Sequence, residues 1–270
     1  MTIASRSLEV GSDRISWLEL GEGAPLVLLH GWSMSHAVFS ELARLLADNF
    51  RLLLPDLPGH GSSSSVRPCS LSAMAEVLGR WLEELQAEPV ALLGWSLGGQ
   101  VAMTLCLDRS TLVERLVLVS STPRFCATEG WSAGLPVGEL RALRRGLQRR
   151  YLATMGEFFD LQFAGEGMNA ERRREILQFA VKASRLPDPE EALETLDILG
   201  REDLRERLSE IAQTSLVIHG ESDRIIPFAA GCYLADHLPK AQLCSLPGVG
   251  HAPFLSAPRQ VAAQLVEFCQ

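Results

Sequence analysis

One short stretch, Gly94-Trp95-Ser96-Leu97-Gly98, restricts what this chain can fold into more than any other. An apolar run at 89–93 precedes it and a helix-like run at 99–103 follows, so it predicts a sharp turn between a strand and a helix. A serine on so tight a turn takes a backbone conformation that side-chain-bearing residues avoid, and glycines two residues away remove clashing Cβ atoms. The stretch therefore predicts a nucleophile elbow that presents the Ser96 hydroxyl at a helix N-terminus, where free N–H groups lie. The alternative is a Gly-rich turn without chemistry.

The rest of the sequence alternates between apolar runs and helical spacing, which predicts an α/β fold with a mostly parallel sheet. Apolar runs, typical of strands buried on both faces, lie at 26–29, 51–54, 89–93, 116–119, 216–218 and 242–246. Helical spacing covers 38–48, 71–85, about 99–107, 228–237 and the end from about Arg259. Residues 1–20 alternate loosely, which indicates a starting antiparallel hairpin.

The alternation stops between about residues 121 and 200, where the sequence shows helical segments and no convincing strand. We therefore expect an α/β core of residues 1–121 and 201–270, with residues 122–200 inserted as a helical lid. An insertion that follows a strand of the sheet lies over the carboxyl ends of the strands, where open sheets bind ligands.

A serine nucleophile needs a base within hydrogen-bond reach, and the base needs a group that orients it. Asp223 is the candidate acid and His251 the candidate base, because each lies in a Gly-containing loop directly after a predicted strand. These loops share the sheet edge that carries Ser96. Asp223 as a turn cap, Glu221 as the acid and, less favourably, Asp197 are the alternatives.

The other histidines carry no catalytic context. His30 is expected to hold its loop by hydrogen bonds, and structural or solvated roles are expected for His36, His60, His219 and His237. Two main-chain N–H groups are candidates for an oxyanion hole: that of Leu97, directly after the nucleophile, and that of Trp32, after the 26–29 strand.

The composition excludes several classes of protein. A net charge of −8 argues against nucleic-acid binding, and no apolar run approaches the roughly 18 residues of a membrane span. The first ten residues lack the pattern of a secretory signal, and six scattered cysteines form no zinc or redox motif. We expect a cytoplasmic monomer without a metal or an organic cofactor.

Four stretches resemble the α/β-hydrolase superfamily, namely 28–32, 56–62, 94–99 and 250–254. More narrowly, the chain resembles the BioH-type pimeloyl-acyl-carrier-protein methyl ester carboxylesterases of biotin synthesis. Tryptophans at 32 and 95, the segment 119–125, and Phe158-Phe159-Asp160-Leu161-Gln162, which is similar to a substrate-contacting stretch of that family, carry the narrower match.

This resemblance implies an eight-stranded sheet with a helical lid and hydrolysis of the methyl ester of a pimeloyl chain tethered to acyl carrier protein. The residues that match the family's substrate contacts are Trp32, Ser96, Leu97, Phe158, Phe159, Asp160, Leu161, Gln162 and His251. Asp160 departs from the family pattern, so its side chain is expected to point outward. The apolar residues Trp131, Phe158, Phe159, Leu161 and Phe163 either line an acyl channel or bury the lid against the core.

Residues 135–185 contain ten basic and six acidic side chains, so the rest of the chain carries a net −12. A basic lid would attract an acidic carrier protein, with Arg172, Arg173 and Arg174 as candidate contacts. A solvated arginine-rich helix face is the alternative. Two further functions stay open: a broad short-chain carboxylesterase or carbon–carbon bond hydrolase, and a ligand receptor that keeps the hydrolase fold.

Overall fold

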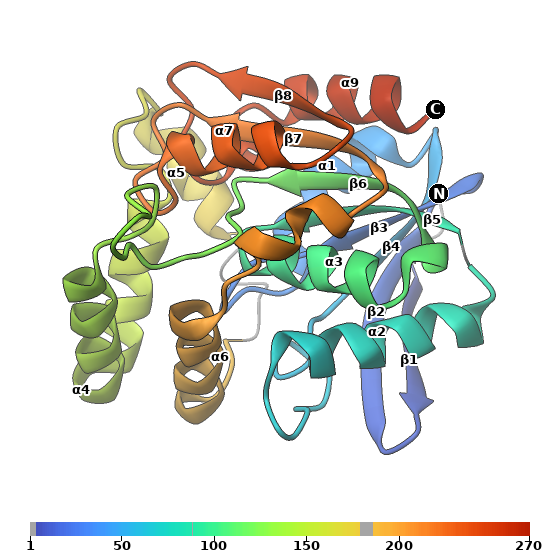
Figure 1. Ribbon diagram of the computed structural model, residues 1–270, viewed down its shortest axis with the longest axis horizontal. Coiled ribbons are helices and arrows are strands. Elements are labelled where there is room, and N and C mark those ends of the chain that lie inside the picture. Colours follow the sequence, from blue (N-terminus) through green and yellow to red (C-terminus); the bar gives the residue numbers. More distant parts are fainter. Residues whose placement is uncertain (1–3, 88, 179–185) are drawn as a thin grey trace.

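The computed structural model describes residues 4–87, 89–178 and 186–270, and its eight strands form one sheet (Figure 1). The strands are β1 Ala4–Val10, β2 Asp13–Leu20, β3 Ala24–Leu29, β4 Phe50–Pro55, β5 Val90–Trp95, β6 Val113–Val119, β7 Thr214–Gly220 and β8 Ala241–Leu246. Their order is β1-β2-β4-β3-β5-β6-β7-β8. β2 is antiparallel to β1 and β4, and the other neighbours are parallel, so the predicted mostly parallel sheet and its starting hairpin are confirmed.

Helices connect the parallel strands, and the last two helices follow the final strand. They are α1 Ser40–Leu46, α2 Leu71–Leu85, α3 Leu97–Asp108, α4 Val137–Leu161, α5 Ala170–Ile176, α6 Pro189–Arg201, α7 Phe228–His237, α8 Pro253–Ser256 and α9 Pro258–Cys269. The short 3-10 helices are η1 His36–Phe39, η2 Ser110–Leu112 and η4 Arg205–Glu210. The bounds predicted for α2 and α7 match the observed ones. None of the helices described here has the length and hydrophobicity of a transmembrane segment.

The central strands of the sheet are buried on both faces. In β3, Leu26 and Leu28 join the apolar cluster that includes α1 and α9, whereas Val27 and Leu29 join the cluster that includes α2 and α3. Successive side chains of a strand point to opposite faces, so a strand covered on both faces needs apolar residues throughout. This requirement explains why the central strands appear in the sequence as unbroken apolar runs.

The segment between β6 and β7 contains the predicted insertion, residues 122–200, and carries α4, α5 and α6, the last of which ends at Arg201, one residue beyond the predicted bound. In Figure 1, α4 and α5 lie at the end of the sheet opposite to the C-terminus. Within the described part of the insertion, strand-like pairing is limited to isolated bridges. Lys182 and Arg185, counted above in the basic stretch, lie outside the described residues. That the insertion acts as a lid remains a prediction.

Helix α4 is broken at Arg150, whose φ of −146° and ψ of 54° are not helical. The two halves of α4 come so close that a Cβ atom on Gly146 would lie 2.7 Å from Thr154 Oγ1. The break therefore turns one long helical segment into a tight helical hairpin, and a glycine is required where its halves meet.

Candidate active site

Ser96 lies on the predicted sharp turn between β5 and α3. Its φ of 55° and ψ of −117° form a strained conformation for a residue with a side chain. A Cβ atom on Gly94 would lie 2.3 Å from the Gly98 carbonyl oxygen, and one on Gly98 would lie 2.4 Å from the Leu29 carbonyl oxygen. Both glycines are therefore sterically required. Ser96 is 6% exposed, so a small part of it reaches open space at the end of the sheet.

Asp223 and His251 form a buried hydrogen-bonded pair, with 2.8 Å between Asp223 Oδ2 and His251 Nδ1. The other carboxylate oxygen, Oδ1, accepts hydrogen bonds from the N–H groups of Ile225 (2.8 Å) and Ile226 (2.9 Å). Burial alone would raise the pKa of Asp223, but the charge of His251 and hydrogen bonds from His219 and His251 hold it well below its usual range. The acid is therefore an anion that fixes a proton on His251 Nδ1, which leaves Nε2 as an acceptor.

The loop of His251 is attached to the elbow through its main chain. The indole Nε1 of Trp95, the residue before Ser96, donates a 2.8 Å hydrogen bond to the carbonyl oxygen of His251. The Trp95 and His251 rings also pack together, with centroids 5.5 Å apart. The sheet edge that carries the nucleophile candidate thus also holds the base candidate, as expected from the spacing of the motifs.

The loop after β3 runs beside the elbow. A Cβ atom on Gly31 would lie 3.3 Å from Ser96 Cβ, so the peptide that leads into Trp32 borders the nucleophile candidate. The indole of Trp32 is bound to the insertion, where it donates to the carbonyl oxygen of Ala192 (3.0 Å) and to Thr195 Oγ1 (3.1 Å). Leu97 begins α3, and N–H groups of a first helical turn have no acceptor within their own helix.

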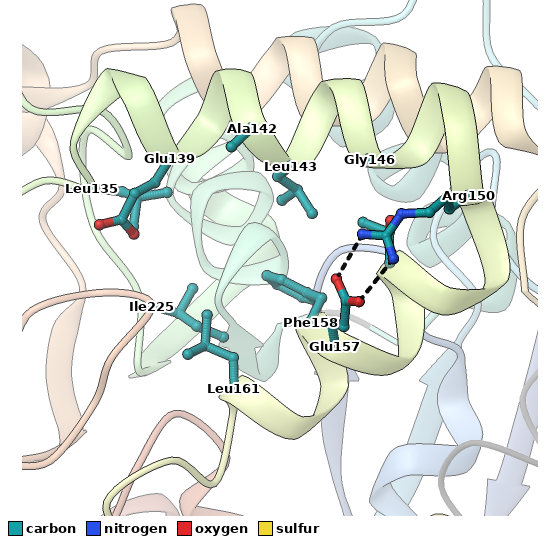
Figure 2. A pocket seen from close by; sticks show the side chains of 11 residues that line it. Leu135, Glu139, Ala142, Leu143, Gly146, Arg150, Glu157, Phe158, Leu161 and Ile225 are labelled. Atoms are coloured by element: carbon teal, nitrogen blue, oxygen red, sulfur yellow. Dashed lines mark hydrogen bonds and ion pairs between the residues drawn. The ribbon is translucent and has the colours of Figure 1, made fainter.

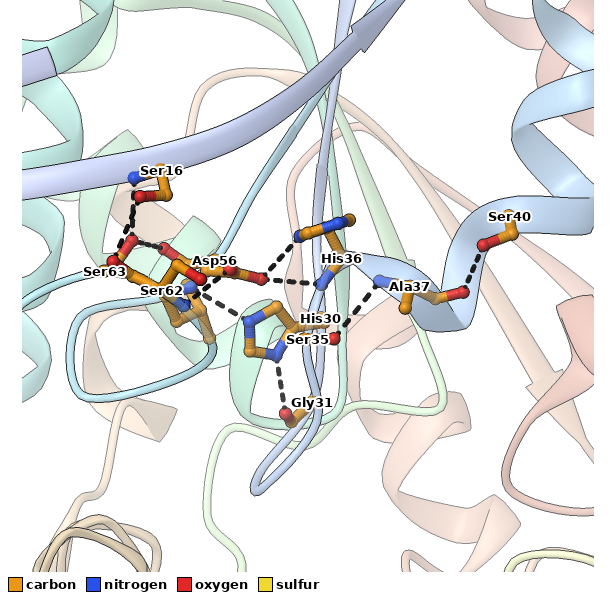
Figure 3. A network of polar contacts seen from close by, with 11 residues as sticks. Ser16, His30, Gly31, Ser35, His36, Ala37, Ser40, Asp56, Ser62 and Ser63 are labelled. Atoms are coloured by element: carbon orange, nitrogen blue, oxygen red, sulfur yellow. Dashed lines mark hydrogen bonds and ion pairs between the residues drawn. The ribbon is translucent and has the colours of Figure 1, made fainter. Parts of the chain in front are cut away.

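A buried polar network supports the loop after β3 (Figure 3). The His30 Nε2 atom accepts from the Leu57 N–H (2.9 Å), so Nδ1 carries the proton and donates to the Gly31 carbonyl oxygen (2.9 Å). Burial lowers the pKa of His30 to about 3, so the ring is neutral. The expectation that His30 holds its loop is confirmed. Next to it, Asp56 accepts hydrogen bonds from the N–H and the imidazole of His36.

Each of the other three histidines has a main-chain carbonyl oxygen as a hydrogen-bond partner, as expected for a structural role, but His219 also lies against Asp223. His60 contacts the Pro58 carbonyl oxygen, His219 that of Ile226, and His237 that of Tyr233.

The predicted substrate stretch 158–162 divides between two environments. Phe158 packs edge-on against Trp32, with ring centroids 4.9 Å apart, and it lines a cavity together with Leu161. Phe159 is buried in the core against Phe163, and Asp160 is exposed and paired with Arg173 at 2.5 Å. Asp160 therefore points outward, as expected. Trp131, the remaining channel candidate, packs against Tyr233, so it stabilises the insertion.

The cavity has a volume of about 350 Å³ and lies largely between the two halves of α4 (Figure 2). Its lining residues are Leu135, Glu139, Ala142, Leu143, Gly146, Arg150, Thr154, Glu157, Phe158, Leu161 and Ile225. An ion pair between Arg150 and Glu157 (3.3 Å) lies on one side of it. Phe158 packs against Trp32, in the loop after β3, and the Ile225 N–H donates to the carboxylate of Asp223, in the loop after β7. The cavity therefore borders these two loops of the candidate site.

The three arginines proposed for carrier binding differ in their surroundings. Arg172 is half-buried and fastens α5 to the core through Glu41 and the Leu255 carbonyl oxygen (2.8 Å). Arg173 pairs with Asp160, and Arg174 is exposed. Arg172 is therefore a structural tie, and reversing its charge would disturb the fold as well as any surface contact.

Two residues at the site were not predicted as parts of it. The first is Glu166, whose Oε1 atom accepts hydrogen bonds from the N–H of Gly250 (2.5 Å) and from Ser256 Oγ (2.9 Å). Close by, the N–H of His251 donates to the Gln162 carbonyl oxygen (2.9 Å). The insertion thus grips the loop of the base candidate. Burial raises the pKa of Glu166. No local sequence pattern predicts that Glu166 contacts the loop of His251.

The second is His219, whose Nε2 atom lies 3.3 Å from Asp223 Oδ2. Its position at the end of a strand, four residues before the acid candidate, was an available sequence signal.

Comparison with known proteins places this chain among relatives that match over nearly its whole length. The model of the alpha/beta hydrolase family matches residues 26–264. Proteins named pimeloyl-(acyl-carrier protein) methyl ester esterase from Nitrosospira multiformis and Nitrosomonas europaea are 37% and 39% identical. These matches cover 93% and 89% of this chain and 96% and 93% of the relatives.

Solved structures show the same fold. An esterase from Exiguobacterium antarcticum has a TM-score of 0.90 at 23% identity, with 98% of this chain and 99% of that chain covered. A bromoperoxidase from Bacillus anthracis has a TM-score of 0.89 at 22% identity, with the same coverage. The chain therefore belongs to the alpha/beta hydrolase family and, within it, to the family of the pimeloyl-(acyl-carrier protein) methyl ester esterases.

Proposed function

We propose that this protein is a carboxylic ester hydrolase that cleaves the methyl ester of a pimeloyl chain carried on acyl carrier protein, with Ser96 as the nucleophile. The observation that carries the proposal is the buried Asp223–His251 pair, attached through Trp95 to the strained turn of Ser96. The names of the relatives, which are more than a third identical over nearly the whole chain, support the choice of substrate.

In the proposed reaction, His251 Nε2 takes the proton of Ser96 Oγ as the oxygen attacks the ester carbonyl. Asp223 stabilises the imidazolium that forms, without taking its proton. The imidazolium then gives its proton to the methoxy oxygen as the C–O bond breaks, so that methanol leaves, and water, activated by the same histidine, hydrolyses the acyl-enzyme. The strained turn assists because it presents Ser96 at the start of α3 without further rearrangement.

The N–H groups of Leu97 and Trp32 are the proposed donors to the oxyanion. Such donors act best when they are held in place before the reaction. Leu97 is fixed by α3, whereas the Trp32 loop is fixed from two sides, by His30 underneath and by Thr195 and Ala192 of the insertion. The insertion therefore helps to set the geometry of the loop that supplies the second donor.

The cavity between the halves of α4 is the proposed place for the acyl chain. Its volume of about 350 Å³ is within the roughly 300–1,000 Å³ of small-molecule sites, and Leu143, Phe158, Leu161 and Ile225 give it apolar walls. Phe158 connects the cavity to the loop of Trp32, the oxyanion loop, and Ile225 connects it to the loop of Asp223. An acyl chain that occupies the cavity therefore extends away from the reacting ester.

A row of arginines on α4 is the proposed contact for the carrier protein. Arg141, Arg145 and Arg149 follow one another at four-residue spacing, so they lie on one face of the helix, and all three are exposed. None of them has an ion pair among the residues that the structure describes, in contrast to Arg172 and Arg173. Leu152, 73% exposed, lies in the second half of α4. Acyl carrier proteins are acidic, which supports such a contact.

The experiment that tests the function compares two substrates, pimeloyl-acyl-carrier-protein methyl ester and p-nitrophenyl butyrate, with the unmodified protein and with Ser96→Ala. We expect a kcat/KM for the carrier-bound ester well above that for the small ester, and loss of both activities in Ser96→Ala. Equal or better use of the small ester would favour a broad carboxylesterase. A single burst of p-nitrophenol without turnover would favour a receptor, and full activity of Ser96→Ala would exclude the mechanism.

A further inference from the structure

A second imidazole lies against the carboxylate of Asp223. His219 is the penultimate residue of β7, before Gly220, and is fully buried. Its Nε2 atom lies 2.9 Å from the carbonyl oxygen of Ile226 and 3.3 Å from Asp223 Oδ2, the same oxygen that accepts the hydrogen bond from His251 Nδ1. One nitrogen of His219 therefore faces two oxygens, one at each end of the turn Asp223–Ile226.

These contacts decide the protonation of the ring. Because both neighbours of Nε2 are acceptors, Nε2 carries a proton. Nδ1 is buried and has no hydrogen-bond partner among the described residues; a Cβ atom on Gly231 would lie 2.5 Å from it. A proton on Nδ1 would therefore be an unsatisfied donor on a buried cation, which is costly. His219 is a neutral Nε2–H tautomer, which donates and does not compete for the proton of His251.

We propose that His219 is a positioning residue for the reaction: its single N–H clamps the turn Asp223–Ile226 and polarises Asp223 Oδ2, so that the carboxylate is aimed at His251 and its basicity is moderated. The inference rests on the proposed function, because it assigns a role in orienting the acid. His219 acts only through Asp223, since no reacting atom is within its reach.

The other groups around Asp223 are few. Its Oδ1 atom is occupied by the N–H groups of Ile225 and Ile226, and His251 faces Oδ2. Glu166, from the insertion, is the further charge that acts on it. Phe228 of α7 packs edge-on against the His219 ring, with centroids 5.9 Å apart, and carries no charge. The effect of removing the His219 donor is therefore separable from that of disturbing the packing around it.

Three variants separate these effects. His219→Phe keeps a planar ring and removes the donor, His219→Gln retains an N–H at the end of the side chain, and Phe228→Leu loosens the packing while His219 stays. We expect His219→Phe to lower kcat on p-nitrophenyl butyrate by about tenfold at pH 8, with KM within about twofold, the size of one lost hydrogen bond to a charged group.

The pH profile is the decisive readout. Without the His219 donor, the negative charge of Asp223 acts more strongly on His251 and favours its protonated form. The acidic limb, which is the low-pH side of the kcat/KM profile, therefore moves to higher pH. His219→Gln should restore the limb and most of kcat, and Phe228→Leu should lower the melting temperature without moving the limb. If His219→Phe leaves the limb in place, or if His219→Gln behaves like His219→Phe, the inference is wrong.

Nuclear magnetic resonance of the unmodified protein tests the inference without turnover. With ¹⁵N-labelled histidine, His219 should show a proton on Nε2 and none on Nδ1 from pH 6 to 8, and the downfield resonance of the His251 Nδ1 proton should shift in His219→Phe. A protonated Nδ1 on His219 would overturn the assignment even if no variant folds. An unmodified protein that lacks esterase activity but shows His219 protonated on Nε2 alone would refute the proposed function and leave the clamp intact.

Discussion

The indole of Trp95 donates a 2.8 Å hydrogen bond to the carbonyl oxygen of His251. The residue before the nucleophile candidate therefore holds the main chain of the base candidate, and a buried hydrogen bond joins two segments 156 residues apart. The bond is buried, so its loss would leave a carbonyl oxygen without a partner.

Trp95→Phe tests this attachment. We expect a loss of about 1–3 kcal/mol in the free energy of unfolding and a roughly tenfold lower kcat, because the imidazole loses its support. Urea unfolding and kinetics on p-nitrophenyl butyrate measure both. Trp81→Phe is the matched control, since the Trp81 indole is equally buried and its N–H has no partner among the described residues. Equal effects on kcat in the two variants would contradict the prediction.

The choice of acid is tested by two neighbouring carboxylates. Asp223→Asn should lower kcat by about 10⁴-fold, because an amide favours the wrong tautomer of His251. Glu221→Gln should leave kcat within about twofold, since Glu221 is exposed whereas Asp223 is buried against His251. Circular dichroism checks that both variants fold. A large loss in Glu221→Gln with little loss in Asp223→Asn would reverse the assignment.

The arginine row on α4 is tested by the double charge reversal Arg145→Glu/Arg149→Glu. At low salt we expect kcat/KM for a carrier-bound ester to fall about tenfold or more, and the fall to shrink as salt rises. Activity on p-nitrophenyl butyrate should not change. Arg44→Glu/Arg259→Glu, on α1 and α9, makes the same change in net charge on exposed residues away from α4. An equal loss in this control would show a general charge effect instead of docking.

Acid should weaken the network under the oxyanion loop. Burial would raise the pKa of Asp56, but the hydrogen bonds from the His36 imidazole and N–H and the charge of His36 lower it overall. A lowered folded-state pKa contributes stability above the unfolded value of about 3.9, and this contribution is lost as the pH falls through the folded value. Asp56→Asn should therefore cost about 1–3 kcal/mol at pH 7 and progressively less below pH 4. Urea unfolding between pH 3 and 7 measures the difference; a constant difference would contradict this account.

The parts of the site that depend on local chemistry were predictable from the sequence. The strained backbone of Ser96 brings the chain so close together that only glycine fits at positions 94 and 98. Asp223 and His251 follow parallel strands, and the carboxyl ends of parallel strands share one edge, so their meeting could be predicted without coordinates.

The insertion was harder to predict because its contacts depend on how helices pack. Phe158 and Phe159 are adjacent and chemically alike, yet one lines the cavity and the other is buried in the core. Helical rotation decides between them, and the break at Arg150 resets that rotation. Arg172 and Arg174 likewise differ only in the direction in which α5 turns them, and no pattern of charge in the sequence reveals it.

The grip of Gln162 and Glu166 on the loop of His251 limits how this protein can admit a substrate. A hinge that lifted the segment 162–166 would pull the base away from its partner, so each opening there would switch the enzyme off. We therefore expect acyl chains to enter the cavity on its other side, where Leu135 and Glu139 line it, without displacement of the segment beside His251.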